Sequence, residues 1–292
     1  MVRVDQFAFQ IRATKDLPVA LRNSYEKASA KEVWSYVIYA PPIVDPPARH
    51  RQMPAGYLLM VGRDRLRIAV ERDVVEELDL PFTDLISIEI GEALLFSWMR
   101  LIFGRRTYRE IKIPFNTVSI ELFRRALFLA RRALDVKFDG ACDSHVNRST
   151  LPFKFQSELQ RWLFEDEKML ELAFQPEIRA RRFIMITQLA PPTLLALTDR
   201  QFLCITEEPP IARERLGKYS SVYVYCPLPR LDSLALEADR ERRGLADLGI
   251  DLVNDRARFR LSVKISGDDL ARFALFCRRT MEALNKSASE GR

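Results

Sequence analysis

The sequence predicts an α+β protein of two similar units, each made of short antiparallel strands followed by one amphipathic helix. Three observations lead to this prediction. Short patterns recur in the same order in both halves of the chain, apolar residues alternate with polar ones before each expected helix, and the apolar spacing then changes to that of a helix. With 292 residues, 48% of them hydrophobic, the chain is long enough to bury a core in each unit.

The internal repeat consists of four short matches. The matching pairs are Ala40-Pro41-Pro42 with Ala190-Pro191-Pro192, Leu58-Leu59-Met60-Val61 with Leu194-Leu195-Ala196-Leu197, Pro81-Phe82 with Pro227-Leu228, and Ala126-Leu127-Phe128 with Ala274-Leu275-Phe276. Their order is the same in both halves, and loops of unequal length account for the changing offset between partners. The predicted division is an N-terminal extension at 1–33, a first domain at 34–134, a linker with a connecting helix at 135–177, a second domain at 178–285 and a C-terminal tail at 286–292.

The segments outside the two domains carry further signals. Residues 7–11 alternate between apolar and polar and predict one extra strand in the N-terminal extension. In the linker, a helix is expected to begin at Ser157, because Ser157 and Gln160 fit a capping box and apolar residues follow over 159–173. The acidic run Glu165-Asp166-Glu167 is then expected to form a solvated face of this helix.

Each domain ends in strands followed by a helix. Apolar residues alternate with polar ones over 259–265, after turn residues at Asn254-Asp255, and the first domain repeats this over 111–115 after Gly104. Helical spacing then takes over. The expected apolar stripes are Ile120, Phe123, Leu127, Ala130 and Leu134 in the first helix and Leu270, Phe273, Ala274, Cys277, Met281 and Leu284 in the second.

This layout resembles the bacterial pleckstrin-homology-like (PH-like, GRAM-like) domains. Residues 57–66 and 194–205 are similar to the second and third strands of that group, and 114–118 is similar to its strand-to-helix junction. The resemblance covers most of 33–134 and 178–285. It implies two tandem PH-like units, each a small antiparallel curled sheet or barrel closed by one C-terminal helix, that bind lipids or proteins and generally do not catalyse a reaction.

One departure from that family concerns phosphoinositide binding. Eukaryotic members carry a basic signature in the first hairpin loop. The first unit has Arg49-His50-Arg51 in this loop, but the second has Ala190-Pro191-Pro192-Thr193. The resemblance therefore does not favour recognition of inositide headgroups.

Composition and cysteine use exclude several kinds of protein. Lys and Arg number 46 and Asp and Glu 40, so the net charge of +6 is small for the length and does not favour nucleic acid as a partner. The four cysteines form no C-x-x-C pair, and Cys142 with His145 supplies half of a zinc site at most. The first residues lack the apolar core of a signal peptide, and no apolar run reaches ~18 residues. We expect a cytoplasmic protein with free thiols and with no metal or cofactor.

The candidate site is the apolar segment 94–106, which ends in two arginines. An apolar protrusion beside arginines is typical of a peripheral membrane contact, because burial and attraction to anionic lipid act together. On this hypothesis Trp98 and Phe103 insert into the membrane. The cations that would meet lipid headgroups are Arg100, Arg105 and Arg106, with Arg49 and Arg51 adding charge from the first long loop. The alternative is a strand buried on both faces, which a continuous apolar run also predicts.

Basic residues also recur on both expected helices. They are Arg124, Arg125, Arg131 and Arg132 on the first and Arg272 and Arg279 on the second. Such a stripe either attracts anionic lipid or nucleic acid or is a solvated face balanced by acidic residues elsewhere. Nucleic-acid binding also calls for aromatic residues between the cations, and here the aromatics occupy the apolar positions of strands and helices.

The functional prediction is a non-enzymatic binding or adaptor protein of tandem PH-like domains that associates peripherally with an anionic membrane surface. The alternative is a protein-only scaffold that binds a peptide or a second copy through a sheet edge or a groove between the domains. Catalysis is not expected, because no group of residues suggests a pocket of carboxylates with perturbed pKa values. The expected partner is an anionic lipid surface or a protein, and not a nucleic acid.

Overall fold

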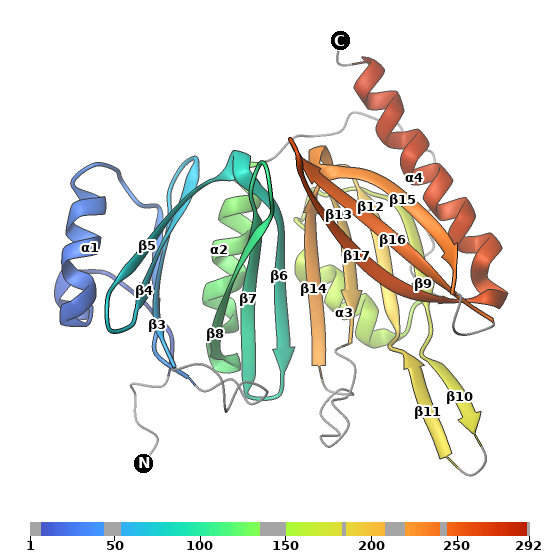
Figure 1. Cartoon of the computed structure of the whole chain (residues 1–292), viewed down its shortest axis with the longest axis horizontal. Coiled ribbons are helices and arrows are strands. Elements are labelled where there is room, and N and C mark those ends of the chain that lie inside the picture. Colours follow the sequence, from blue (N-terminus) through green and yellow to red (C-terminus); the bar gives the residue numbers. More distant parts are fainter. Residues whose placement is uncertain are drawn as a thin grey trace. The chain divides into compact units, whose positions relative to one another are not determined.

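The computed structural model shows a mixed α+β chain whose sheets are antiparallel (Figure 1). It describes residues 7–43, 54–134, 150–182, 185–207, 220–239 and 244–290. The chain divides into two compact units. The first consists of 1–104 and 109–135, and the second of 105–108 and 136–292.

The first unit opens with a five-stranded antiparallel sheet in the order β1-β2-β3-β4-β5. Its strands are β1 (Phe9–Gln10), β2 (Tyr36–Ala40), β3 (Gly56–Val61), β4 (Arg65–Glu71) and β5 (Glu76–Pro81). The short β1 pairs Phe9 with Tyr39 and lies where one extra strand was expected. Residues 9–10 of the N-terminal extension are therefore part of this sheet.

Helix α1 (Val19–Ser29) packs on one face of the five-stranded sheet (Figure 1). Leu17, Leu21 and Ala28 share a buried cluster with the sheet residues Val37, Tyr39, Leu58, Met60 and Ala69. The residues on the opposite face of β2 and β3 are buried as well. Every position of these two strands is therefore buried. The sequence does not reveal α1, because its buried residues are Leu21, Ser24 and Ala28, which do not form an apolar stripe.

Three more strands and a helix complete the first unit. They are β6 (Leu85–Ala93), β7 (Phe96–Phe103), β8 (Arg109–Asn116) and α2 (Ile120–Ala133), and β6, β7 and β8 pair as antiparallel neighbours. Gly104, with a φ of 138°, follows β7 at the expected turn. The rings of Phe115 and Phe123 stack with centroids 3.7 Å apart and join β8 to α2. The predicted stripe of α2 is confirmed, because Phe123, Leu127 and Ala130 are buried.

Besides the connecting helix α3 (Phe153–Trp162), the second unit contains a four-stranded array, a hairpin, three more strands and a helix. The array has the order β14-β13-β12-β9 and consists of β9 (Met169–Gln175), β12 (Thr193–Thr198), β13 (Gln201–Thr206) and β14 (Ser220–Pro227). The remaining elements are the hairpin of β10 (Ile178–Arg182) and β11 (Met185–Ala190), the strands β15 (Leu231–Ala238), β16 (Leu245–Asn254) and β17 (Ala257–Ser266), and the helix α4 (Leu270–Glu290).

The predicted alternation in β17 is confirmed. Phe259 and Ile265 are buried, whereas Arg258 and Arg260, on either side of Phe259, are exposed. Asp255 has a φ of 55° in the two-residue turn before β17, a conformation that aspartate adopts more easily than most residues. The polar and apolar faces of this hairpin therefore follow from its sequence.

The connecting helix differs from the prediction. Helix α3 (Phe153–Trp162) follows Pro152 directly, so it begins four residues before Ser157 and no capping box forms there. The helix ends at Trp162 because Leu163 adopts an extended conformation with a ψ of 150°. The apolar residues over 169–173 that were expected on this helix lie in β9 instead.

The two units share a succession of elements. In each, a short 3₁₀ turn (Phe82–Asp84 or Leu228–Arg230) leads into three antiparallel strands, and a second one (Thr117–Ser119 or Gly267–Asp269) leads into the final helix. The expected antiparallel strands are present, but in neither unit do the described strands close into a barrel. Of the helices in the described part of the chain, none combines the length and apolar character needed to cross a membrane.

Candidate functional site

The predicted site segment 94–106 forms β7 and the turns at its two ends. The alternative of a buried strand fits best, because Trp98 is 5% and Phe103 is 6% exposed. A side chain that inserts into a membrane must reach the lipid. The insertion expected of Trp98 and Phe103 therefore does not fit the structure.

Trp98 is a packing residue of the β6–β7–β8 array. Its ring covers Gly91, where an added Cβ would lie 2.0 Å from the indole. Its Nε1 donates to Glu89 Oε1 at 2.7 Å, and Lys112 Nζ lies 4.8 Å from the ring centroid. The packing on Gly91, the hydrogen bond to Glu89 and the contact with Lys112 together fix the position of the indole on the sheet.

Arg100 is engaged on the same face of the array. Its guanidinium forms ion pairs with Glu89 at 3.3 Å and Glu110 at 2.5 Å, on the two neighbouring strands. The three residues form a cross-strand ladder of charges. An anionic headgroup would have to displace both carboxylates to reach Arg100. Arg100 therefore stabilises the pairing of the strands instead of offering a free cation to lipid.

The other arginines of the predicted site do not gather around Trp98. Arg105 and Arg106 are exposed beyond the far end of β7, and the eight residues of this strand span about 26 Å at roughly 3.3 Å per residue. The backbone carbonyl of Arg105 accepts hydrogen bonds from the N–H groups of Arg256 and Ala257, each at 2.7 Å, which places the 105–108 segment in the second unit. Arg49 and Arg51 lie outside the described residues.

Exposed apolar side chains do gather at the near end of β7. Leu94 is 50%, Leu95 is 74% and Val118 is 72% exposed. The backbone N–H of Thr117 donates to the carbonyl of Leu95 at 3.2 Å, which holds Val118 beside the β6–β7 turn. Leu94 takes up a positive φ of 52° in that turn. We call Leu94, Leu95 and Val118 the apolar tip; Leu94 and Leu95 lie in the predicted segment, but Val118 does not.

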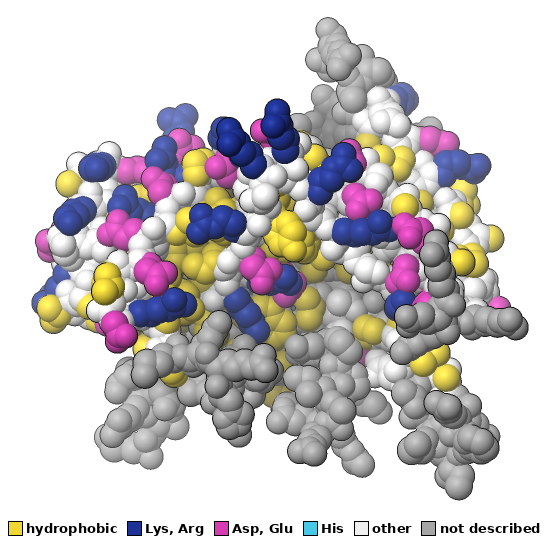
Figure 2. Space-filling model, viewed as in Figure 1, with side chains coloured by type: hydrophobic (Ala, Val, Ile, Leu, Met, Phe, Trp, Pro, Cys, Tyr) yellow, Lys and Arg dark blue, Asp and Glu magenta, His cyan; other side chains and the backbone are white. Residues whose placement is uncertain are grey.

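Charges of both signs surround the apolar tip. Glu92 precedes it, and Glu121 follows it at the start of α2. Glu121 pairs with Arg124 at 2.6 Å. On the face of the molecule shown in Figure 2, cationic and acidic side chains are likewise interspersed. These charges near the tip therefore do not form a group of cations that would attract a negatively charged surface.

The arginines of the predicted basic stripes are engaged as well. On α2, the guanidinium of Arg125 lies 4.9 Å from the centroid of the Tyr36 ring, and Arg131 is 2% exposed. On α4, Arg272 pairs with Asp269 at 3.0 Å. The interpretation of these stripes as helix faces balanced by other residues is therefore favoured over a lipid or nucleic-acid surface.

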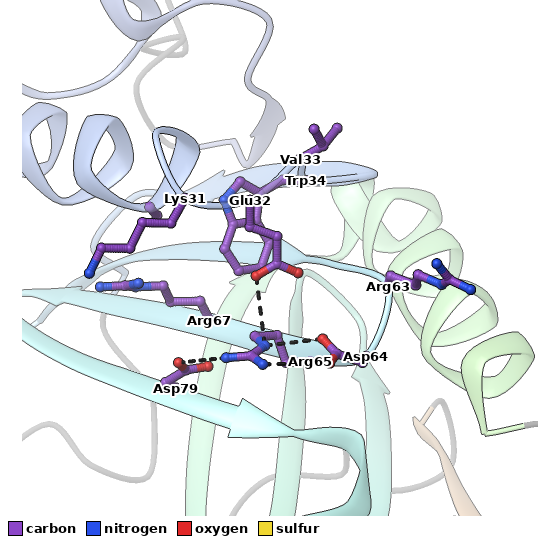
Figure 3. A pocket seen from close by; sticks show the side chains of 10 residues that line it. Lys31, Glu32, Val33, Trp34, Arg63, Asp64, Arg65, Arg67 and Asp79 are labelled. Carbon is purple, nitrogen blue, oxygen red and sulfur yellow. Dashed lines mark hydrogen bonds and ion pairs between the residues drawn. The ribbon is translucent and has the colours of Figure 1, made fainter.

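A polar pocket lies in the first unit beside the C-terminal end of α1 (Figure 3). Its volume is about 690 Å³, and seven of its ten described lining residues are charged. The lining comes from the segment after α1, from the β3–β4 turn and from outward-facing side chains of β4 and β5. None of the ten is a serine, a cysteine or a histidine.

Arg65 is the centre of an ion-pair cluster in this pocket. Its guanidinium lies 3.0 Å from Asp64, 3.2 Å from Asp79 and 3.7 Å from Glu32 (Figure 3). The hydrogen bond from Arg65 holds the pKa of the Asp64 carboxyl below its usual value. The same carboxylates raise the pKa of Arg65. The cluster joins the segment after α1 to β4 and β5.

Two of the lining residues have a buried donor that lacks an acceptor among the described residues. The two donors are the indole nitrogen of Trp34 and Nε of Arg67. Arg67 uses another nitrogen to bond Glu77 at 2.5 Å, and hydrogen bonds from Ser24 and Arg67 lower the pKa of Glu77. Both unbonded nitrogens have almost no exposed surface, so they do not open into the pocket.

A buried polar network in the second unit was not foreseen. Glu167, expected on a solvated helix face, is 7% exposed. Its carboxylate accepts hydrogen bonds from Thr198 Oγ1 and Gln201 Nε2, both at 2.6 Å, and from the backbone N–H of Phe164 at 2.9 Å. The hydroxyl of Tyr223 donates to the side-chain oxygen Oε1 of Gln201 at 2.6 Å. Because the carboxylate is fully bonded, this network stabilises the connection between α3 and β9 and is not an open site.

The described residues contain no group of three or more His, Cys, Asp and Glu side chains placed to hold a metal ion. Cys204, Cys226 and Cys277 are buried, and burial raises the pKa of the Cys277 thiol to about 11. Cys142 and His145 lie outside the described residues. Comparisons with protein-family models and with curated proteins find no match to this chain.

Proposed function

We propose that the protein is a non-enzymatic adaptor of two PH-like units that binds a protein partner through the apolar tip of the first unit. The PH-like assignment is supported by the order of elements. β2 to β5 precede β6 to β8 and α2 in the first unit, and β9 and β12 to β14 precede β15 to β17 and α4 in the second. This succession of four strands, three strands and one helix agrees with the resemblance in sequence.

The observation that carries the proposed binding role is the joint exposure of Leu94, Leu95 and Val118. Single exposed apolar residues are common on protein surfaces, but adjacent ones mark contact sites. Burying one leucine side chain is worth about 2 kcal/mol, so a partner that covers this tip gains appreciable affinity. The hydrogen bond between Thr117 and Leu95 presents the three side chains together.

A protein partner is favoured over an anionic membrane for two reasons. The aromatic rings expected to insert, Trp98 and Phe103, are buried. The charges beside the apolar tip are Glu92 and the Glu121–Arg124 pair, which give no net attraction to anionic lipid. Insertion of two leucines without electrostatic help leaves a weak membrane contact.

Co-sedimentation with vesicles separates the two partner classes. Vesicles of phosphatidylcholine, with and without phosphatidylserine, are spun with the full chain across a salt series. We expect no binding that depends on phosphatidylserine or weakens with salt. Binding to the anionic vesicles that salt removes, and that Leu94→Ser with Leu95→Ser reduces, would return the assignment to a membrane contact.

Site-specific photocrosslinking in cells tests the apolar tip directly. A photoreactive phenylalanine replaces Leu95, and the control replaces Val74, which is 75% exposed in the β4–β5 turn of the same unit. We expect one defined protein adduct from position 95 and none from position 74. The purified partner is then expected to lose about tenfold or more in affinity for Leu95→Ser and none for Val74→Ser. Equal adducts from both positions, or equal affinities, would contradict the proposal.

A further inference from the structure

We propose that a second surface of the protein, formed by Arg106, Arg256 and Arg258, binds an acidic segment of a protein. We call these three residues the arginine patch. All three belong to the second unit, whereas the apolar tip belongs to the first. The arginine patch therefore goes beyond the proposed contact at the apolar tip, and either role can fail without the other.

The arginine patch forms where the chain after β7 lies beside the β16–β17 turn. The backbone carbonyl of Arg105 accepts the N–H groups of Arg256 and Ala257, each at 2.7 Å. Farther along the same two segments, the rings of Tyr108 and Phe259 meet edge to face with their centroids 5.3 Å apart. The segments are therefore fixed to each other at two points, and every residue of the arginine patch lies within one position of these contacts.

Positive charge is concentrated in these two segments. Residues 105–108 and 254–259 contain four arginines and a single acidic residue, Asp255. This excess of three positive charges equals half of the net charge of +6 that the whole chain carries. All four arginines are exposed, and Lys and Arg side chains gather around the β16–β17 turn in Figure 2. Such a surface attracts a partner of opposite charge.

The side chains of the arginine patch are not engaged within the protein. None of the three forms a hydrogen bond or an ion pair with another residue in the described part of the chain. Arg260, farther along β17, is by contrast paired with Glu237 at 2.5 Å. Because a guanidinium can hold a carboxylate through two parallel N–H groups, each arginine of the patch can take one carboxylate of a partner.

The size of the arginine patch favours a protein segment over lipid or nucleic acid. Polybasic segments that bind anionic lipid contain about 4–8 cations, and strong binding of DNA commonly draws on about 6–10 phosphate contacts. Three unpaired arginines with one aspartate beside them are fewer than either partner calls for. Tyr108 is 48% exposed in the same segment as Arg106. Tyrosine and arginine are the residues enriched where protein–protein contacts contribute most to affinity.

The test is an NMR titration of the ¹⁵N-labelled full chain with an acetylated hexaglutamate peptide, read at the backbone amide signals. We expect saturable shifts confined to 105–108 and 254–260, with a dissociation constant of about 1 mM or below that rises with salt. Hexaglutamine, which has the same length without the charge, is expected to cause no such shifts.

The other two classes of partner are separate arms of the same test. An oligothymidylate that saturates these signals at a lower concentration than hexaglutamate would overturn the proposal in favour of nucleic acid. Sedimentation with phosphatidylserine vesicles that is lost on substitution of the arginine patch would overturn it in favour of lipid.

Variants of exposed residues keep the test independent of folding. Arg106→Gln, Arg256→Gln and Arg258→Gln are each expected to raise the dissociation constant for hexaglutamate about threefold, the loss of one exposed ion pair, and all three together about 25-fold. Arg12→Gln, at an exposed arginine of the first unit, is the matched control and leaves the constant unchanged. Leu95→Ser is also expected to leave it unchanged, which separates this surface from the apolar tip. Shifts that do not saturate, or a constant unaltered in the triple variant, would overturn the proposal.

Discussion

Two glycines within strands are covered by side chains from the neighbouring strand. A Cβ on Gly91 in β6 would lie 2.0 Å from the Trp98 indole, and a Cβ on Gly249 in β16 would lie 2.1 Å from the Arg260 guanidinium. The indole is buried and bonded to Glu89, so it has no space to move into. The Arg260 side chain is 45% exposed and can swing into solvent. An added Cβ is therefore expected to cost more folding free energy at Gly91 than at Gly249.

Replacing each glycine by alanine measures this difference. Gly91→Ala is expected to lower the free energy of unfolding by about 2–3 kcal/mol, because the Trp98 ring must leave its place on the sheet. Gly249→Ala is expected to change it by less than about 1 kcal/mol. Urea unfolding followed by circular dichroism gives both values. Equal losses of unfolding free energy would show that the Trp98 indole moves aside as easily as the Arg260 guanidinium.

Asp199 is a buried carboxyl whose ionisation opposes folding. It is 9% exposed, and its Oδ1 accepts the backbone N–H of Lys168 at 2.9 Å. Burial raises its pKa above the usual 3.8, although the bond from Lys168 acts in the other direction. The folded state therefore holds this proton more tightly than the unfolded state. The stability that Asp199 contributes falls as the pH rises from about 3.8 through the raised value.

Asp199→Asn removes this titration and keeps an oxygen for the Lys168 N–H. The stability of the variant relative to the unsubstituted protein is expected to increase as the pH rises from roughly 3.5 to 6. Urea unfolding at several pH values measures the difference. Asp255→Asn, in the exposed turn before β17, is the matched control. If the stability difference changes equally with pH in both variants, burial of Asp199 is not the cause of the pH dependence.

At the level of elements, the four sequence matches do not all join equivalent parts. Pro81 and Pro227 both precede the 3₁₀ turn that leads into three antiparallel strands, so this match holds. Ala40 ends β2, which pairs with β3, whereas Ala190 ends β11, which pairs with β10. Short apolar patterns recur easily in strands, and strand pairing depends on distant residues that such patterns do not contain.

The match between the closing helices is displaced. Leu127 is buried, but its sequence partner Leu275 is 37% exposed. The burial pattern instead relates Phe123, Leu127 and Ala130 to Phe273, Cys277 and Thr280. Helical periodicity decides which residues face the core. The predicted stripe is correct for α2, but of the six residues predicted for α4 only Phe273 and Cys277 are buried, and Leu270 and Ala274 are exposed. Phe276 and Thr280 are buried on α4 instead.

The candidate site was harder to predict than the fold because its parts come from distant segments. The pocket combines Trp34, Arg63, Arg65 and Asp79 from the segment after α1, the β3–β4 turn and two strands, and in sequence each is an ordinary surface charge or aromatic residue. The segment 94–106 was recognisable as apolar. Its division into a buried strand and an exposed tip depends on the neighbouring strands β6 and β8, which the sequence does not place.

For the whole molecule, the division into two compact units makes a prediction about cooperativity. Phe123 in α2 and Phe273 in α4 are both fully buried within their own units. Phe123→Leu and Phe273→Leu are each expected to lower the free energy of unfolding by about 1–2 kcal/mol through lost packing. If each unit opens as a body, the loss of protection stays within the unit that carries the substitution.

Hydrogen exchange read by mass spectrometry resolves this by peptide. Phe123→Leu is expected to speed exchange in β2 to β8 and leave β12 to β17 unchanged, and Phe273→Leu is expected to do the reverse. Each variant serves as the other's control, because the same substitution is made at an equally buried helix position. Faster exchange across both units in both variants would mean that the two unfold together. The helix of each unit would then stabilise strands that it does not touch.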